Sequence, residues 1–416
     1  MPAKNHLSIS ATTSRGKIVH PATRPEDSTD VLFTRGYALQ QAGKYRAAAS
    51  CYVKALKERK NDPAIYNNLG NCLRSLGGYD ASIQCYDKAL SLHPGRVSSV
   101  LNRSLALLSL GEYEKAWPGY EARLGVVDFR QQLLELPERK WKGERLGKGK
   151  TLYVYGNQGL GDEIQCFRFL SKVAERVAHV VLEIQRPLKG LTRNLPSNID
   201  VIERGEAVPP FYKWCEIFSL PGIFQVTEES VPPPVRPDYL VDLQVKDWIE
   251  SNRERNPGKL QVGIVWSGNP SNSLNGIRSC KLEKWEPLLS REDIAMVSLQ
   301  VGQPSGELSS LDESIRPRNL APLLVDFDAT ATAVDSLDLV ITTDTSVPHL
   351  VGSLGKEGWV FLPRYADWRW GRESANTPWY PDLRLFRQKK EGDWSSVINR
   401  VNQELSAKTN RMAKSV

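Results

Sequence analysis

The chain has 416 residues, of which 40% are hydrophobic and 25% charged, and its formal net charge is +7. These values are ordinary for a soluble globular protein of about two or three domains, and no run of about 18 apolar residues predicts a membrane-spanning helix. The Lys and Arg residues are dispersed, so the positive charge favours a phosphate-bearing small molecule over nucleic acid as the ligand.

The first segment, residues 1–28, is rich in Ser, Thr, Pro and basic residues and has no apolar stretch typical of a signal peptide. We therefore expect a disordered leader at 1–28 and a cytoplasmic protein. The six cysteines of the chain form no Cys-x-x-Cys pair, which favours packing residues in a reducing compartment over a zinc or disulfide framework.

A 34-residue period covers residues 29–125. Gly43, Gly77 and Gly111 recur at this spacing, as do two tyrosine positions and one leucine position. The recurring tyrosines and leucines are Tyr45, Tyr79, Tyr113, Tyr52, Tyr86, Tyr120, Leu56, Leu90 and Leu124. Such a pattern is typical of tetratricopeptide repeats, in which pairs of antiparallel helices stack. The sequence predicts three repeats with a concave surface for an extended peptide or a protein face.

A Gly- and Lys-rich connector at 126–150 precedes a stretch in which short apolar runs alternate with helical patterns. This alternation predicts parallel sheets covered by helices. A Pro-rich passage at 231–237 and a polar one at 251–259 divide the stretch, so we expect two Rossmann-like lobes, 151–255 and 256–416, with a central cleft. The expected strands are 151–155, 179–184, 199–203, 262–266, 294–300, 337–342 and 358–362. The expected helices are 162–176, 283–290 and 346–354.

The loops after these strands are candidate sites, because ligands bind beyond the carboxyl ends of parallel strands. The first loop carries Gln158, Gly159, Leu160 and Gly161 and ends at Asp162. Its glycines permit close approach of a ligand, and a simple tight turn is the alternative. Asp162 either caps the following helix or projects into the cleft as a general base.

The second loop carries small hydroxyl and amide groups, with an arginine close behind. These residues are Ser267, Gly268, Asn269, Arg278 and Ser279. They either hold a phosphate or form a polar surface loop.

The third loop joins a predicted strand to a predicted helix and carries Asp344, Thr345 and Ser346. Free amides at the helix start predict an anion site there, reinforced by the helix dipole. His349 lies on the first helical turn, as a functional or a structural residue. A separate Asp-Phe-Asp segment beginning at Asp326 precedes an Ala- and Thr-rich helix, so we interpret it as a helix cap and not as a metal site.

Five short motifs, taken in order, resemble one known family. They are Gly159 to Asp162, Gly268-Asn269 with Arg278-Ser279, Ser298 to Gln300, Asp344-Thr345 with His349-Leu350, and Tyr365 to Trp370. The resemblance covers about residues 30–405 and is to the bacterial tetratricopeptide-repeat glycosyltransferases, whose catalytic part is similar to the heptosyltransferases. It implies a GT-B fold with the acceptor on the first lobe and a nucleotide-sugar on the second, and metal-independent, inverting chemistry.

The same resemblance implies a role for each matching residue. Asp162 corresponds to the base that removes the acceptor proton, and Arg278 to the arginine of the donor loop. The donor-phosphate motif corresponds to Asp344, Thr345, Ser346 and His349. Gln300, at the end of a strand in the donor lobe, is expected near the nucleotide.

We therefore hypothesise a glycosyltransferase that moves a sugar from a nucleotide-sugar to a hydroxyl of a protein or saccharide acceptor recruited by the repeats. No cofactor and no metal are expected. The alternative is an interaction adaptor whose GT-B part is catalytically degenerate. Two departures bear on that choice: Ile277-Arg278 replaces the family's Lys-Arg, and Trp214-Cys215 replaces a His-Cys pair.

Overall fold

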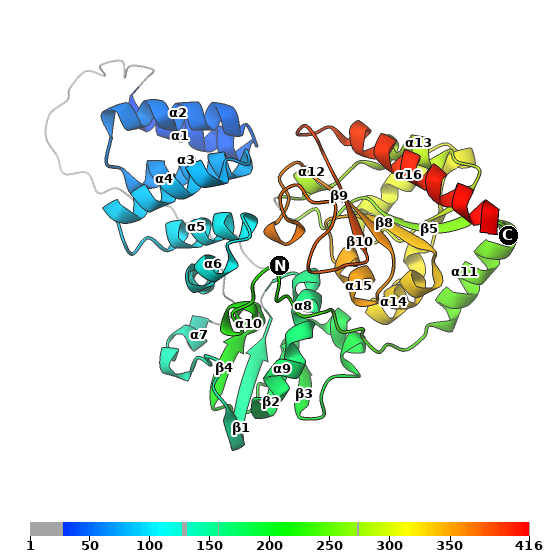
Figure 1. Ribbon diagram of the computed structural model, residues 1–416, viewed down its shortest axis with the longest axis horizontal. Coiled ribbons are helices and arrows are strands. Elements are labelled where there is room, and N and C mark those ends of the chain that lie inside the picture. Colours follow the sequence, from blue (N-terminus) through cyan, green and yellow to red (C-terminus); the bar gives the residue numbers. More distant parts are fainter. Residues whose placement is uncertain (1–27, 127–130, 157, 273, 416) are drawn as a thin grey trace, which may run out of the picture.

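The structure is a computed structural model that describes residues 28–126, 131–156, 158–272 and 274–415. Apart from Ser28, the leader expected at 1–28 lies outside the described residues. The chain forms a helical array followed by two α/β lobes (Figure 1). The three parts meet near the middle of the molecule.

The array consists of three pairs of antiparallel helices, as the 34-residue period predicts. They are α1 (Thr29–Gln41), α2 (Tyr45–Glu58), α3 (Pro63–Ser75), α4 (Tyr79–Leu92), α5 (Val97–Ser109) and α6 (Tyr113–Tyr120). Gly43, Gly77 and Gly111 follow the first helix of each pair with φ of +71°, +76° and +79°. Glycine adopts this left-handed conformation at little cost. Gly70 lets α3 approach α4, since a Cβ there would lie 2.5 Å from the ring of Tyr86.

The first lobe contains a four-stranded parallel sheet in the order β3-β2-β1-β4. Its strands are β1 (Leu146–Tyr155), β2 (Val177–Ile184), β3 (Ile199–Glu203) and β4 (Lys213–Glu216). β1 begins inside the predicted connector, and β4 was not predicted because four residues are too short for a pattern. The helix expected at 162–176 is divided into α8 (Leu160–Cys166), a 3-10 turn and α9 (Leu170–Ala174).

The second lobe contains a six-stranded parallel sheet in the order β10-β9-β8-β5-β6-β7. Its strands are β5 (Leu260–Val265), β6 (Ile294–Ser298), β7 (Arg318–Asn319), β8 (Leu339–Thr343), β9 (Gly358–Leu362) and β10 (Leu383–Arg387). Every residue of β5, β6, β8 and β9 is buried, because helices cover both faces. Its helices are α12 (Asn275–Arg278), α13 (Glu286–Leu289), α14 (Phe327–Ser336), α15 (Val347–Ser353) and α16 (Trp394–Ser415).

One helix corrects the expected lobe boundary. α11 (Leu243–Arg255) lies within the predicted first lobe, and its last turn occupies part of the polar passage at 251–259. It packs on the second lobe, where Asn252 Nδ2 donates to Gln261 Oε1 at 2.8 Å and the Asp242 amide donates to Thr332 Oγ1 at 3.0 Å. The many charged residues of this helix hide its apolar face from a reading of the sequence.

The array is attached to both lobes by buried contacts. The indole Nε1 of Trp379 donates to the hydroxyl of Tyr113 at 3.1 Å, and the indole Nε1 of Trp117 donates to the Val226 carbonyl at 2.7 Å. Arg123, just after α6, forms a buried ion pair with Glu216 at the end of β4. These contacts fix the position of the repeats relative to the lobes, because separating them would expose unpaired polar groups.

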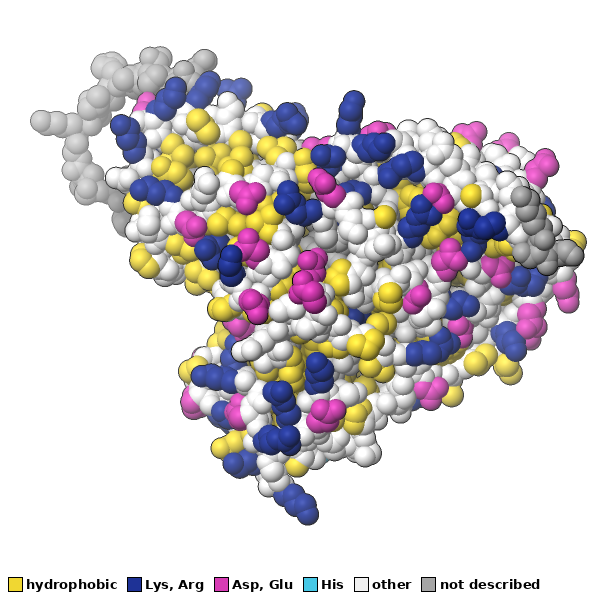
Figure 2. Space-filling model, viewed as in Figure 1, with side chains coloured by type: hydrophobic (Ala, Val, Ile, Leu, Met, Phe, Trp, Pro, Cys, Tyr) yellow, Lys and Arg dark blue, Asp and Glu magenta, His cyan; other side chains and the backbone are white. Residues whose placement is uncertain are grey.

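The Lys and Arg side chains spread over the array and both lobes on the visible face, without forming a single stripe (Figure 2). This distribution agrees with the dispersal seen along the sequence. Among the described residues, no helix is long and apolar enough to cross a membrane.

Candidate functional site

A cavity of about 350 Å³ lies where the array and both lobes meet. Its wall on the array includes Tyr45, Arg74, Ser75, Tyr79 and Ser109. Its walls on the lobes include Gln158, Asp162, Arg278, Asp344, Arg364, Tyr365, Asp367 and Arg369. Four predicted site residues therefore face one space, and side chains from the repeats face it too. A larger cavity of about 510 Å³, lined by Trp117, Trp141 and Ile223 among others, includes no predicted site residue.

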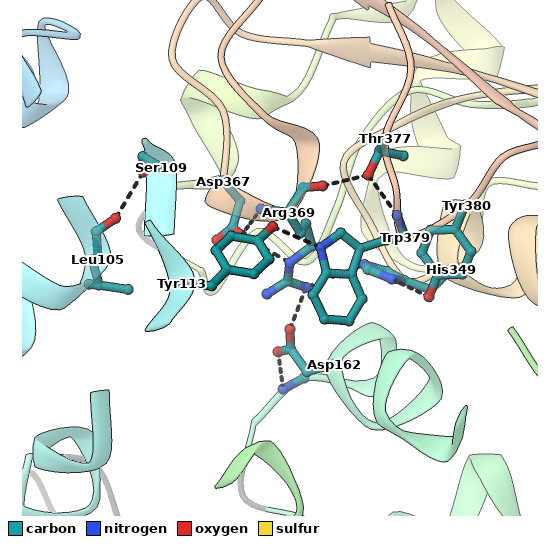
Figure 3. A network of polar contacts seen from close by, with 11 residues as sticks. Leu105, Ser109, Tyr113, Asp162, His349, Asp367, Arg369, Thr377, Trp379 and Tyr380 are labelled. Atoms are coloured by element: carbon teal, nitrogen blue, oxygen red, sulfur yellow. Dashed lines mark hydrogen bonds and ion pairs between the residues drawn. The ribbon is translucent and has the colours of Figure 1, made fainter. Parts of the chain in front are cut away.

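Asp162 lies on the first turn of α8 with about 20% of its side chain exposed. Its Oδ2 accepts a hydrogen bond from the Gly159 amide at 2.9 Å, which caps the helix. Its Oδ1 accepts from Arg369 Nη1 at 2.6 Å across the lobe boundary (Figure 3). The geometry allows Asp162 to cap the helix and also to act as a general base. Each carboxylate oxygen keeps a further lone pair that a substrate hydroxyl could use.

Arg369 is the main residue that the sequence did not assign to the site. Its Nε donates to Asp367 Oδ1 at 2.9 Å, and its side chain is only 10% exposed. The carboxylates of Asp367, Asp162 and Asp344 raise the pKa of the guanidinium well above its ordinary value despite burial. The sequence feature that could have pointed to Arg369 is the Tyr365 to Trp370 segment. That segment contributes to the family resemblance, but the resemblance assigns no role to its arginine.

His349 does not face the cavity. The side chain is 1% exposed, with Nδ1 3.0 Å from the Tyr380 hydroxyl and Nε2 3.4 Å from Arg369 Nη1. Burial and the charge of Arg369 hold the pKa of His349 well below its ordinary value, so the ring is neutral. Because a guanidinium only donates, Nε2 is the acceptor and Nδ1 carries the proton. His349 thus contacts Arg369, and the expected contact of His349 with the donor phosphate stays a prediction.

Gly161 lies where the two lobes touch. A Cβ at this position would lie 2.6 Å from His349 Cδ2 and 3.0 Å from the Ser346 Cα. α8 and α15 are therefore packed too closely for any side chain here. Leu160, beside it, is partly buried against the core. The second glycine of the Gly-x-Gly motif thus serves the contact between the lobes.

The third loop places the carboxyl group of Asp344 in the cavity. Burial, followed by the nearby charge of Asp367, raises the pKa of Asp344 to about 6. Thr345 Oγ1 accepts from the Val347 amide at 3.2 Å, so Thr345 supports the first turn of α15. Ser346 is the residue before that helix, makes no side-chain cap, and packs against Gly161.

The second loop holds its shape through side chains that face inward. Gln300 Oε1 accepts from the amides of Trp266 and Ser267 at 3.1 and 2.9 Å, and the side chain is 3% exposed. Gln300 therefore orders the loop, and its expected place near the nucleotide stays a prediction. Ser267 and Ser279 share a hydrogen bond of 3.1 Å between their hydroxyls.

Of the five predicted residues of the second loop, Arg278 lines the cavity, together with Asn272, Leu274 and Ile277. It ends α12, and its guanidinium lies over Gly268, where a Cβ would be 2.8 Å from Nη2. Asn269 is exposed and accepts from the Ser271 amide at 2.9 Å, as a local turn. The Asp326 side chain accepts from the Ala329 amide at 2.9 Å, which confirms the predicted helix cap.

These features define a class. Residues 33–96 and 73–124 match the tetratricopeptide repeat family, and the parallel sheets of the two lobes have the organisation of a GT-B fold. The chain thus contains tetratricopeptide repeats, which are followed by an α/β part of two lobes with parallel sheets.

Individual proteins that resemble the chain include protein FlbA of Caulobacter vibrioides, which is 25% identical over 312 residues. The match covers 69% of this chain and 51% of FlbA, so the chain spans about half the length of that relative. The structure of E. coli ADP-heptose LPS heptosyltransferase II is 11% identical and covers 63% of this chain and 99% of its own, with a TM-score of 0.42. The Arabidopsis OM64 TPR domain is 22% identical and covers 24% and 81%, with a TM-score of 0.23.

Proposed function

We propose that the protein transfers a sugar from a nucleotide-sugar to a hydroxyl group of a protein or saccharide acceptor. The observation that carries the proposal is that Asp162, Arg278 and Asp344 line one cavity together with residues of the array. A carboxylate and a cation on opposite lobes suit a reaction that removes a proton on one side and releases a phosphate on the other.

Asp162 is the proposed base. One oxygen takes the proton of the acceptor hydroxyl, and the acceptor oxygen attacks the anomeric carbon of the sugar. The bond from that carbon to the phosphate oxygen breaks, and its electron pair leaves with the nucleoside phosphate. Attack on the face opposite the leaving group inverts the anomeric centre. Arg369 and the Gly159 amide hold the Asp162 carboxylate in place for the first step.

Arg278 is the proposed partner of the departing phosphate. It lies on the cavity wall of the second lobe beside Asp344, which belongs to the loop that resembles the donor-phosphate motif. A guanidinium in a partly closed space stabilises developing negative charge by several kcal/mol. Metal independence stays a prediction. The described part of the chain has no group of three or more His, Cys, Asp or Glu residues that could hold a metal ion.

The repeats supply the acceptor in this proposal. Tyr45, Arg74 and Tyr79 come from successive helices of the array and reach the same cavity as Asp162. An acceptor lying along the array therefore has a path to the proposed base without any movement of the repeats. Aromatic and arginine side chains at such a surface favour a polypeptide or a carbohydrate ring as the bound group.

The first test is a thermal-shift screen of nucleotides and nucleotide-sugars. A donor at about 100 times its dissociation constant should stabilise the fold by about 2.7 kcal/mol. Incubation of the full chain with that donor and a cell extract, followed by mass spectrometry, should then reveal a macromolecule that gains one sugar. Repeating both assays with excess EDTA should change neither result.

The decisive variant is Asp162→Asn, with Asp247→Asn on the exposed face of α11 as the matched control. The amide oxygen of the introduced asparagine can still accept from the Gly159 amide, so the helix cap persists. Asp162→Asn should abolish transfer and keep the donor-induced thermal shift, and Asp247→Asn should change neither. An active Asp162→Asn enzyme would eliminate Asp162 as the base. Absence of any nucleotide-induced shift would favour an adaptor with a degenerate GT-B part.

A further inference from the structure

A second pocket, of about 280 Å³, adjoins the reaction cavity and carries strong positive charge. Its cationic residues are Arg364, Arg372, Arg387, Lys389 and Arg400, and Glu373 is its acidic residue. The two pockets share Tyr79, Arg364 and Tyr365 on their walls. We refer to this second space as the basic pocket. Five cations in so small a space repel one another, and one carboxylate offsets only part of that repulsion. A bound anion would offset more of it.

In the described part of the chain, the cations of the basic pocket form no direct ion pair, although Glu373 and Asp344 lie near Arg387 and Asp393 lies near Arg400. Within the described residues, none of the five forms an ion pair, and the hydrogen bonds that they donate go to carbonyl or hydroxyl oxygens. Arg364 Nη1, for example, donates to the Lys389 carbonyl at 2.6 Å. Arg372 lies over the ring of Tyr79, with 5.5 Å between its Cζ and the ring centroid. By contrast, the buried arginines Arg123 and Arg369 form ion pairs, with Glu216 and with Asp162.

Unused donors lie at the base of the basic pocket. Arg387, the last residue of β10, donates from Nη2 to the carbonyls of Trp370 and Gly371 at 2.9 Å each, and its Nε and Nη1 are buried without a partner among the described residues. Gln388 is 2% exposed, and its Nε2 is likewise buried and unpartnered in that part of the chain. A buried donor without a partner destabilises the fold, so three such donors together favour an absent acceptor group.

Two further features agree with an absent anion. Burial lowers the pKa of Arg387 to about 10, because desolvation outweighs the attraction of Asp344 and Glu373. The pocket also lies at the carboxyl end of β10, the edge of a parallel sheet at which ligands bind.

The array forms part of the wall. Gly77 lines the basic pocket from the loop between α3 and α4, and a Cβ there would overlap the ring of Tyr365. Gly77 also has a φ of +76°. Two independent features therefore favour glycine here: the lack of space for a Cβ and the left-handed backbone. A group bound in the basic pocket would therefore touch the array and the second lobe together.

We propose that the basic pocket binds a carboxylate or phosphate group of a ligand that also occupies the adjoining reaction cavity. The donor and the acceptor are the two possible sources of that group. The inference rests on the proposed function only in naming the adjoining space a reaction cavity. Anion binding is measured directly and does not need sugar transfer.

The test uses inorganic pyrophosphate as the probe and isothermal titration calorimetry of the full chain. The variant Arg372→Gln/Lys389→Gln removes two exposed cations of the basic pocket, and Lys246→Gln/Arg255→Gln removes two exposed cations of α11. The two variants have the same net charge. The first should weaken pyrophosphate binding by about tenfold or more relative to wild type, and the second by less than about twofold. Thermal unfolding of each variant checks that the fold is retained.

Equal affinities in the two double variants would overturn the proposal, as would a failure of pyrophosphate to bind the wild-type protein. A second titration, in the presence of a nucleoside diphosphate, distinguishes the sources. Displacement of pyrophosphate assigns the anionic group to the donor, whereas binding of both together assigns it to the acceptor. If no sugar is transferred but the double variants still differ, the proposed function fails and the anion site stands.

Discussion

Arg369 of the second lobe donates to Asp162 of the first lobe, with 2.6 Å between Nη1 and Oδ1, although the two residues are 207 positions apart in the chain. The same guanidinium also contacts Asp367 and lies 3.4 Å from His349 Nε2. The Arg369 guanidinium thus contacts the proposed base Asp162, the cavity residue Asp367, and the neutral imidazole of His349. The residue thus forms one of several contacts between the lobes, beside the ion pairs Arg193–Asp328 and Arg236–Asp335.

Replacing Arg369 should therefore destabilise the protein strongly. Arg369→Gln leaves Asp162 and Asp367 without their cation in a partly buried site, and we expect the free energy of unfolding to fall by about 3–5 kcal/mol. Arg384→Gln is the matched control, because Arg384 is 44% exposed and pairs with Glu404 on the surface. The control should cost about 1 kcal/mol or less. Urea unfolding monitored by tryptophan fluorescence measures both, and equal losses would contradict the role given to Arg369.

Asp344 should make stability depend on pH. Its folded-state pKa of about 6 exceeds the ordinary value of 3.8, so between these pH values the folded protein keeps a proton that the unfolded chain has released. The contribution of Asp344 to the free energy of unfolding therefore falls as pH rises through this window, by at most about 3 kcal/mol. Asp344→Asn removes this dependence.

The measurement for Asp344 is urea unfolding of the wild type and the variant at pH 4 and pH 7. Asp344→Asn should gain stability relative to wild type at pH 7 and lose that advantage at pH 4. Asp247→Asn, at an exposed position, should track the wild type at both pH values. A difference between Asp344→Asn and wild type that does not change with pH would refute the shifted titration.

Tyr113 should anchor the repeats to the second lobe. Tyr113→Phe removes the hydroxyl that accepts from Trp379 Nε1 and leaves that buried donor unpaired, at a cost of about 1–3 kcal/mol. Tyr37→Phe changes a hydroxyl on a side chain that is 51% exposed and should be neutral within about 0.5 kcal/mol. Thermal unfolding compares the two. A neutral Tyr113→Phe would mean that the indole finds water instead.

Gly161 should be intolerant of a methyl group. In Gly161→Ala the new Cβ would overlap His349 and the Ser346 backbone, so we expect a loss of about 1–3 kcal/mol and a weaker response to the donor. Gly306→Ala is the control, because a Cβ there meets nothing within 4 Å. Differential scanning calorimetry with and without the donor measures both effects. A Gly161→Ala protein as stable as Gly306→Ala would show that α8 and α15 can separate freely.

The repeat array could be predicted almost completely from the sequence. Its contacts are between neighbouring helices, so each structural requirement recurs every 34 residues, as the left-handed φ of Gly43, Gly77 and Gly111 illustrates. The strands of the two sheets were also largely predictable. β3 and β9 have the predicted bounds, and β9 is a fully buried parallel strand, which appears in the sequence as a short apolar run.

The site was predicted in part, for a physical reason. Asp162, Arg278 and Asp344 follow strands, and the topology of parallel sheets brings strand ends together. His349 and Gln300 are buried, which the sequence could not foresee because it does not reveal whether a polar side chain faces a cavity or the interior. Burial depends on residues far away in the chain.

What the amino-acid sequence determined by itself was thus local: the period of the repeats, the alternation of strands and helices, and the loops that could carry chemistry. Only the tertiary structure decided that the array forms a wall of the cavity, that Arg369 binds Asp162, and that a basic pocket lies beside them. Each of these relationships joins residues that are distant in sequence. They arise from packing between modules, whose geometry leaves no periodic trace in the chain.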